Sequence, residues 1–277
     1  EGWSQYKVVV SSLTLGKNID FEYYESKDGI EISKYIGNSK EVKIPEEING
    51  KPVIKIGNNA FVNSKITSVE FNENVKIIGE KAFYNSKDLE MISGTDHIEY
   101  VYAYAFHNTK WYSDQFQSLI IIGKAFYRFN DTFSLEREIT IDEGIISISP
   151  YAFENCLGVS EINLPNSLLE IDKGAFKNCQ NLLEMSLPLN IQIIDDETFS
   201  NCYRLKKVSF DRNVYMIGEK AFSDCNLLKE ISSLENVQYI KNQAFDGCSM
   251  ISEVKLPAGL KELGKNAFRN CLVLEIS

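Results

Sequence analysis

The stretch IGEKAFSDCNLLKEI, Ile217 to Ile231, recurs along the second half of the chain. A globular enzyme has no reason to reuse one phrase in this way, so the repetition bears directly on the fold. The other copies are IDKGAFKNCQNLLEM from Ile171, IDDETFSNCYRLKKV from Ile194, IKNQAFDGCSMISEV from Ile240 and LGKNAFRNCLVLEI from Leu263.

The copies follow one another at a nearly constant interval. Measured at the phenylalanine of the AF or TF pair, the later steps are 23 residues and the earlier ones 22 or 23. The step from Phe106 to Phe153 is 47 residues, which leaves room for one degenerate unit. Such a period is typical of a solenoid, in which each unit buries its apolar face only against its neighbours. The repeat phenylalanines are Phe61, Phe83, Phe106, Phe153, Phe176, Phe199, Phe222, Phe245 and Phe268.

Each unit places its apolar residues on one plan. The LxxIxL part alternates, as a short strand with one buried face requires. The xxAFxxC part is too short for a full helix, and we interpret it as a helical or 3-10 turn. We therefore predict an α/β fold: a right-handed leucine-rich-repeat solenoid of about ten rungs. A parallel β-sheet is expected on the concave face and short helical or 3-10 turns on the convex face.

The pattern LPxxLxxIxxxAFxxCxxLxxIxL resembles the repeat of the BspA-like family of bacterial surface proteins. The segment DGIEISKYIGNSKEVKIPEEINGKPVIKIGNNAF, Asp28 to Phe61, is similar to the start of that family's first repeat. The resemblance covers about Phe21 to Ser277. It implies an exported protein, extracellular or at the cell surface after removal of a signal peptide, that serves attachment or recognition.

Composition narrows the classes of partner. The 277 residues are 44% hydrophobic and 25% charged, as in soluble packed proteins. The formal net charge of −10 argues against nucleic acid as a partner, because phosphate binding needs clustered Lys and Arg. No apolar run reaches the length of a transmembrane helix, so no membrane insertion is expected within this chain.

The six cysteines share one position, three residues after the phenylalanine, where earlier units have Ser64, Ser86 and Thr109. A small, weakly polar side chain inside a turn explains all nine positions, since free cysteine is among the most buried residue types. Although an even count in an exported chain suggests disulfides at first sight, we predict a buried ladder. The cysteines are Cys156, Cys179, Cys202, Cys225, Cys248 and Cys271.

No motif indicates catalysis or a metal site. The sequence has no CxxC pair, GxSxG or HExxH, and its two histidines, His97 and His107, lie outside recognisable motifs. A solenoid has no natural deep pocket, which ligand sites usually need. We predict that the protein is not an enzyme and has no catalytic residues, cofactor or metal.

Two groups of residues are candidates for contact with a partner. The first is a column on the outer face of the predicted strands. It is either a docking strip for basic or amide-rich groups or a solvated surface that keeps the solenoid soluble. Its residues are Glu161, Glu184, Lys207, Glu230 and Glu253.

The second group belongs to an aromatic cluster where the period breaks, around SLIIIGKAFYRF, which predicts an extra strand or hairpin. Large rings either fill the core of a longer unit or form an exposed platform for a protein or a sugar. The rings proposed for the platform are Tyr102, Trp111, Tyr112 and Tyr127.

The ends of the chain lack or interrupt the pattern. Residues 1–44 are expected to form an amino-terminal cap, with a hairpin turn at Asp28-Gly29. Residues 45–277 hold the repeats, with an irregular unit at about 107–150, and we expect one domain overall. The sequence stops at CLVLEIS, inside a strand, which favours a natural protein that continues beyond Ser277.

The function hypothesis is a non-enzymatic module on a bacterial surface, or secreted from it, that binds a host or microbial macromolecule. This partner is a protein or glycan, with host extracellular or mucosal ligands among the candidates. The alternative is a passive stalk or spacer that presents another domain. The spacer predicts that neither candidate surface matters to any activity.

Overall fold

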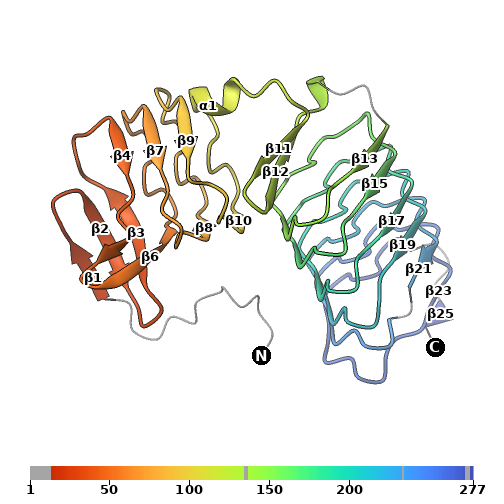
Figure 1. Ribbon diagram of the computed structural model, residues 1–277. Helices are drawn as coiled ribbons and strands as arrows, with labels where there is room; N and C mark the ends of the chain where they lie inside the picture. Colours follow the sequence, from red (N-terminus) through yellow and green to blue (C-terminus); the bar gives the residue numbers. More distant parts are fainter. Residues whose placement is uncertain (1–13, 134–136, 233, 272–274, 277) are drawn as a thin grey trace. The chain divides into compact units, whose positions relative to one another are not determined.

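The computed structural model describes residues 14–133, 137–232, 234–271 and 275–276 (Figure 1). Its contacts gather into two compact units, residues 14–116 with 122–125, and residues 117–121 with the described part of 126–277. The expectation of a single domain with a cap at 1–44 stays a prediction, and residues 1–13 of that cap lie outside the described residues.

The first unit opens with antiparallel strands. Strand β2 pairs antiparallel with both β1 and β3. Gly29, in the turn between β2 and β3, adopts φ 151°, a conformation that glycine reaches at little cost. The hairpin predicted at Asp28-Gly29 is therefore confirmed. The strands are β1 (Thr14–Lys17), β2 (Phe21–Glu25) and β3 (Ile30–Tyr35).

Parallel ladders follow. One continues from β3 through β6 (Lys51–Ile56), β8 (Ile77–Ile78) and β10 (Tyr100–Val101). The other joins β4 (Glu41–Lys43), β7 (Ser68–Glu70) and β9 (Met91–Ser93). Strand β5 (Glu47–Ile48) forms a short hairpin with β6.

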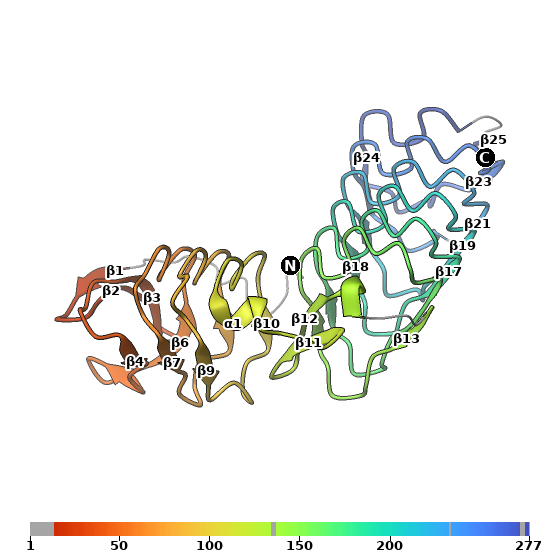
Figure 2. The same cartoon turned by 90° about the horizontal axis from the view of Figure 1, so that it is seen from above.

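The second unit repeats the same two ladders over more rungs. Strands β17, β19, β21 and β23 follow one another along one side, with β18 and β24 on the other (Figure 2). The strands of the first side are β13 (Glu138–Thr140), β15 (Glu161–Asn163), β17 (Glu184–Ser186), β19 (Lys207–Ser209), β21 (Glu230–Ile231), β23 (Glu253–Val254) and β25 (Glu275–Ile276). They pair in three short parallel sheets, β13–β15, β17–β19–β21 and β23–β25. The strands of the second side are β14 (Ser147–Ile148), β16 (Glu170–Ile171), β18 (Ile193–Ile194), β20 (Met216–Ile217), β22 (Tyr239–Ile240) and β24 (Glu262–Leu263). They pair in two parallel groups, β14–β16 and β18–β20–β22–β24.

The segment SLIIIGKAFYRF forms strands β11 (Leu119–Ile122) and β12 (Ala125–Phe129), which are neighbours in one sheet with β14 and β16. The predicted extra hairpin is confirmed. Gly123 adopts φ 61° in the short connection between the strands, a value that favours glycine.

The AF segments are not helical, and this part of the predicted fold class is wrong. The structure is a β-solenoid of stacked coils. Within the described residues the helices are α1 (Lys110–Ser113) and a 3-10 turn at Asp131–Phe133. None of the described helices is long and apolar enough to cross a membrane. The winding hand and the concave position of the sheet stay predictions.

Backbone hydrogen bonding explains why the AF segments cannot become helices. Around Phe199, the amides of Glu197, Phe199 and Asn201 donate to carbonyls of the next rung, whereas the amides between them donate within their own turn. An α-helix would require every amide to donate inside the segment. Half of the amides instead join neighbouring rungs, as in a sheet.

This alternation requires left-handed residues two positions before and two after each phenylalanine, as at Glu197 (φ 56°) and Asn201 (φ 62°). Asparagine tolerates this region better than most residues. The position two residues after the phenylalanine is filled only by Asn, Asp or Gly. These residues are Asn63, Asn85, Asn108, Asn155, Asn178, Asn201, Asp224, Gly247 and Asn270.

The phenylalanines form a stacked core in each unit. In the second unit, adjacent ring centroids lie 4.8 Å apart for Phe126–Phe153 and 5.4 Å apart for Phe153–Phe176. In the first unit, Phe61 and Phe83 are 4.8 Å apart. Phe126 comes from strand β12, so the irregular unit also supplies a ring to the stack.

The cysteines form the predicted buried ladder and are all free. Each Sγ from Cys179 onward donates to the carbonyl of a phenylalanine one rung earlier, as from Cys202 to Phe176 at 3.2 Å. Ser86 makes the equivalent bond to the Phe61 carbonyl at 2.6 Å. Burial raises the pKa of the Cys202, Cys225 and Cys248 thiols far above their ordinary value, so they stay protonated.

Candidate binding surface

The predicted acidic column lies on the exposed side of the first strand ladder of the second unit. All five side chains are exposed, while Ile162, Met185 and Val208 beside them are buried. Sheet pairing sets Lys207 between Glu184 and Glu230, and it sets Glu161 beside Glu138. The alternation expected of a strand with one buried face is confirmed.

A parallel column of small polar residues runs beside the acidic one. It holds Asn163, Ser186, Ser209 and Ser232, with the exposed Lys255 beyond them. Because these side chains are short, the surface is hollowed between the acidic column and the loops that follow the strands.

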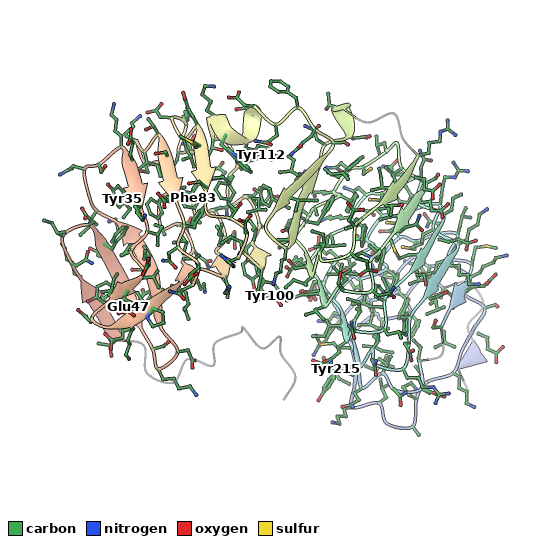
Figure 3. The ribbon with its side chains drawn as sticks, viewed as in Figure 1. Tyr35, Glu47, Phe83, Tyr100, Tyr112 and Tyr215 are labelled. Carbon is green, nitrogen blue, oxygen red and sulfur yellow. The ribbon has the colours of Figure 1, made fainter. Side chains whose placement is uncertain are left out.

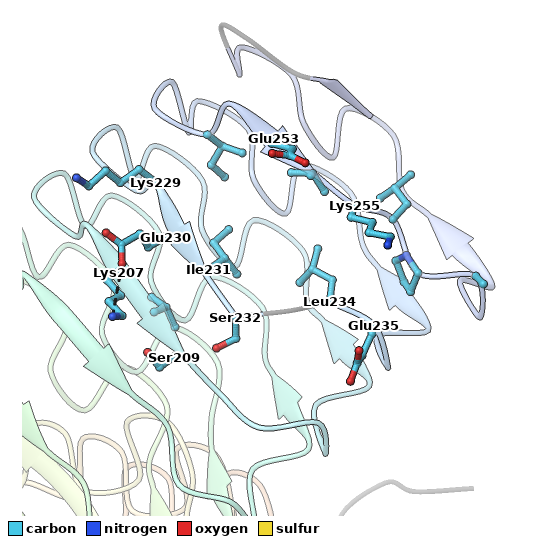
Figure 4. A pocket seen from close by; sticks show the side chains of 16 residues that line it. Lys207, Ser209, Lys229, Glu230, Ile231, Ser232, Leu234, Glu235, Glu253 and Lys255 are labelled. Carbon is cyan, nitrogen blue, oxygen red and sulfur yellow. Dashed lines mark ion pairs between the residues drawn. The ribbon is translucent and has the colours of Figure 1, made fainter. Parts of the chain in front are cut away.

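Three neighbouring hollows, which share Ser209 in their linings, together form one groove. One of about 720 Å³ is lined by Lys207, Ser232 and Glu253 among others (Figure 4). A second of about 630 Å³ is lined by Glu161, Glu184 and again Lys207. A third of about 500 Å³ lies along the loop side, where Leu189 and Arg212 take part in the wall.

Few of the groove's charges are neutralised by neighbours. Lys207 pairs with Glu230 at 3.5 Å, and both side chains are about half exposed, 46% and 55%. No ion pair holds Glu161 or Glu184 within the described part of the chain. Exposed pairs of this kind contribute little to stability, so the carboxylates are available to a partner.

The arrangement suits binding better than catalysis. An acid–base catalyst works in a site that excludes water and positions one group against the substrate, whereas these carboxylates stand in solvent. One charge per rung, repeated at about 4.8 Å, instead offers a regular series of contacts. No cluster of three or more His, Cys, Asp or Glu that could hold a metal occurs among the described residues.

Sequence reasoning missed part of this surface. Glu138 extends the acidic column and Thr140 extends the polar one. The stretch Arg137-Glu138-Ile139 has the same pattern as Ser160-Glu161-Ile162, so a signal was present inside the segment that we had interpreted as irregular. Arg212 and Glu235 form an ion pair at 3.3 Å on the loop side. They stand 23 residues apart, at the same offset in consecutive units, so the repeat register could have revealed this pair.

The proposed aromatic platform is not supported at Tyr127, which is 5% exposed in strand β12. Trp111 is half-buried, and its ring lies 5.0 Å from that of the buried Phe106. Tyr127 therefore lies in the core, as the alternative interpretation held, whereas Trp111 keeps part of its surface exposed and its role in a platform stays a prediction. Tyr102 and Tyr112 are half-buried in the first unit and keep some exposed surface.

A different aromatic group surrounds His107, which lies outside any recognisable motif. Its ring stacks on Tyr84 at 5.7 Å and meets the edge of Tyr104 at 5.8 Å. The ring centroid of Tyr112, which is labelled in Figure 3, lies 6.2 Å from that of His107. These rings come from turns of consecutive rungs, a juxtaposition that the repeat offsets alone could have suggested.

Comparison with known families supports the repeat assignment. A family model described as "BspA type Leucine rich repeat region" matches six copies, over residues 34–157, 125–232 and 217–277. These ranges cover most of the chain. No curated protein matches the chain at a significant level.

Several solved bacterial structures are similar to the chain. A leucine-rich repeat protein of T. pallidum is 26% identical over 75% of this chain and 87% of that one, with a TM-score of 0.38. One from Eubacterium ventriosum is 14% identical over 91% and 93%, with a TM-score of 0.47. A leucine rich cell surface protein of Faecalibacterium prausnitzii is 19% identical over 96% and 94%, with a TM-score of 0.38.

Proposed function

Because the chain belongs to the BspA-type leucine-rich repeat family, we propose that it is a non-enzymatic binding module of a bacterial surface or secreted protein. Its task is attachment or recognition through the repeat surface. Membership of this family supports a location at the bacterial surface or outside the cell. The exposed strand face supports the mode of action.

The groove of the second unit is the observation that carries this proposal. It combines a floor of short polar side chains with a row of carboxylates that includes Glu161, Glu184 and Glu253. Short side chains let a partner approach the strands closely, and the carboxylates favour basic or amide groups. The partner is a protein or glycan with such groups spaced along an extended segment.

Binding to an immobilised panel of matrix proteins, mucins and glycans at low and high salt tests the proposal. The test variant changes Glu161, Glu184, Glu230 and Glu253 to Gln. The matched control changes four exposed carboxylates of the first unit to Gln, namely Glu46, Glu47, Glu73 and Glu90. Both variants lose the same charge, so only the position of the change differs.

The proposal expects salt-sensitive binding that the test variant loses and the control keeps, because exposed charges are screened by salt. Equal loss in both variants would show a general effect of charge and contradict a localised groove. Absence of binding to every member of the panel would favour the passive spacer.

A further inference from the structure

The first unit carries a hollow whose charged lining residues are all basic, whereas the groove of the second unit is lined by both lysines and glutamates. It has a volume of about 630 Å³ and lies between the loop 36–40 and the first AF turn, residues 58–66. Three lysines, Lys34, Lys40 and Lys65, line it, and no carboxylate occurs among the described residues that do so. This hollow stands out because the chain as a whole carries a net charge of −10.

The lysines are exposed, and no ion pair occupies any of them within the described residues. Some other lysines of the same unit are paired, as Lys43 is with Glu70 at 3.0 Å and Lys55 with Glu31 at 3.1 Å. Three free ammonium groups around one hollow favour an anionic ligand, because their repulsion is relieved when a negative charge binds between them.

The walls of the hollow are held in place. The Tyr35 ring, labelled in Figure 3, stacks on Phe61 at 5.1 Å, and its hydroxyl donates to the Ser39 carbonyl at 2.8 Å. The amides of Ile36 and Gly37 both donate to the Asp20 carbonyl. A loop anchored at both ends pre-forms the site, which lowers the ordering cost of binding.

Amide side chains add neutral hydrogen-bonding groups. Asn38, Asn58 and Asn59 line the hollow beside the lysines. The Oδ1 atom of Asn58 accepts from the Glu80 amide at 2.9 Å, which fixes the orientation of that side chain. Amides suit the hydroxyl groups of a sugar, which both donate and accept.

Size and charge together limit the ligand class. The volume lies within the roughly 300–1,000 Å³ of small-molecule sites. A long polyanion such as nucleic acid would be repelled by the net negative charge of the whole chain. We propose that this hollow binds one anionic sugar unit, carrying a carboxylate or a sulfate ester, through Lys34, Lys40 and Lys65 with Asn38 and Asn58. The inference is independent of the groove in the second unit.

Calorimetric titration of the full chain tests the site, with glucuronate and glucosamine 6-sulfate as probes and with glucose and inorganic sulfate as controls. The test variant is K34Q/K40Q/K65Q. The matched control is K87Q/K206Q/K265Q, which removes the same charge from exposed lysines elsewhere. Urea unfolding of both variants confirms that each retains its fold.

We expect at least one acidic sugar to bind more tightly than glucose and than sulfate. The test variant should weaken that binding about tenfold or more, since each surface charge contributes modestly, and the control should leave it unchanged. Which acidic sugar binds distinguishes a carboxylate from a sulfate ester. The Asn38→Ala change should weaken sugar binding and leave any sulfate binding unaltered.

A change at Asp20 provides an independent test of the site. The Asp20 carboxylate lies against Gly37, which lines the hollow. Together with burial, this carboxylate raises the pKa of Tyr35. The Asp20→Asn change should therefore tighten the binding of an acidic sugar. Equal affinity in both triple-lysine variants, or sulfate binding as tight as sugar binding, would overturn the proposal. So would no binding of either acidic sugar at about 10 mM, the weak end of specific affinities.

Discussion

At the scale of single residues, the buried thiols link stability to pH. An unfolded cysteine ionises near pH 8.5, whereas burial keeps Cys202 and Cys225 protonated well above that value. Between these values the unfolded chain releases protons that the folded chain retains, so the free energy of unfolding falls as pH rises. Each such thiol contributes a slope of about 1.4 kcal/mol per pH unit.

The Cys202→Ser change tests this linkage. Serine keeps a donor for the Phe176 carbonyl and does not ionise, so stability should depend less steeply on pH above about 8.5. Urea unfolding between pH 7 and pH 10 measures the slope. An unchanged slope would mean that the thiol titrates alike in both states. Cys271, whose pKa burial raises to about 11, is the half-buried comparison.

The left-handed asparagines give a second prediction at this scale. Asn201 adopts φ 62°, and its side chain donates to Asn178 at 2.8 Å. The Asn201→Ala change should cost about 1–2 kcal/mol, because alanine is strained in this region. The Asn201→Gly change should cost less, since glycine is not strained there. If urea unfolding showed the same loss of stability for both variants, the effect would instead come from the lost side-chain hydrogen bond to Asn178.

At the scale of elements, the strands were predictable and the turns were not. Alternation in stretches such as Glu161–Asn163 fixes which residues face inward, because a strand has a period of two. The AF turns are set by bonds to neighbouring rungs, which no single repeat contains. The recurring asparagine was visible in the sequence but was not interpreted as a left-handed position. Phe126 was missed because its ring enters the stack from a strand.

The groove also makes an element-scale prediction. Ser209 belongs to the short floor, so the Ser209→Tyr change should fill the groove and abolish partner binding at any salt concentration. The control is Ser93→Tyr, at the equivalent last position of strand β9 in the first unit. Binding assays on both variants decide the matter, and retained binding by Ser209→Tyr would contradict the groove as the contact surface.

At the scale of the whole molecule, stacked phenylalanines transmit stability between rungs. The Phe83→Ala and Phe199→Ala changes should each cost about 3–5 kcal/mol, because a fully buried ring is lost. The proposed single domain predicts that calorimetry shows one transition, lowered by either change. Two transitions, each lowered by only one of the changes, would mean that the two units unfold independently.

We propose that the acidic strand face of the second unit contacts the partner. Carbodiimide labelling of carboxylates, followed by mass spectrometry with and without a partner identified on the panel, tests it directly. We expect protection of Glu161, Glu184 and Glu253 and unchanged labelling of Glu46 and Glu73. Unchanged labelling of the strand-face carboxylates, with protection elsewhere, would contradict it.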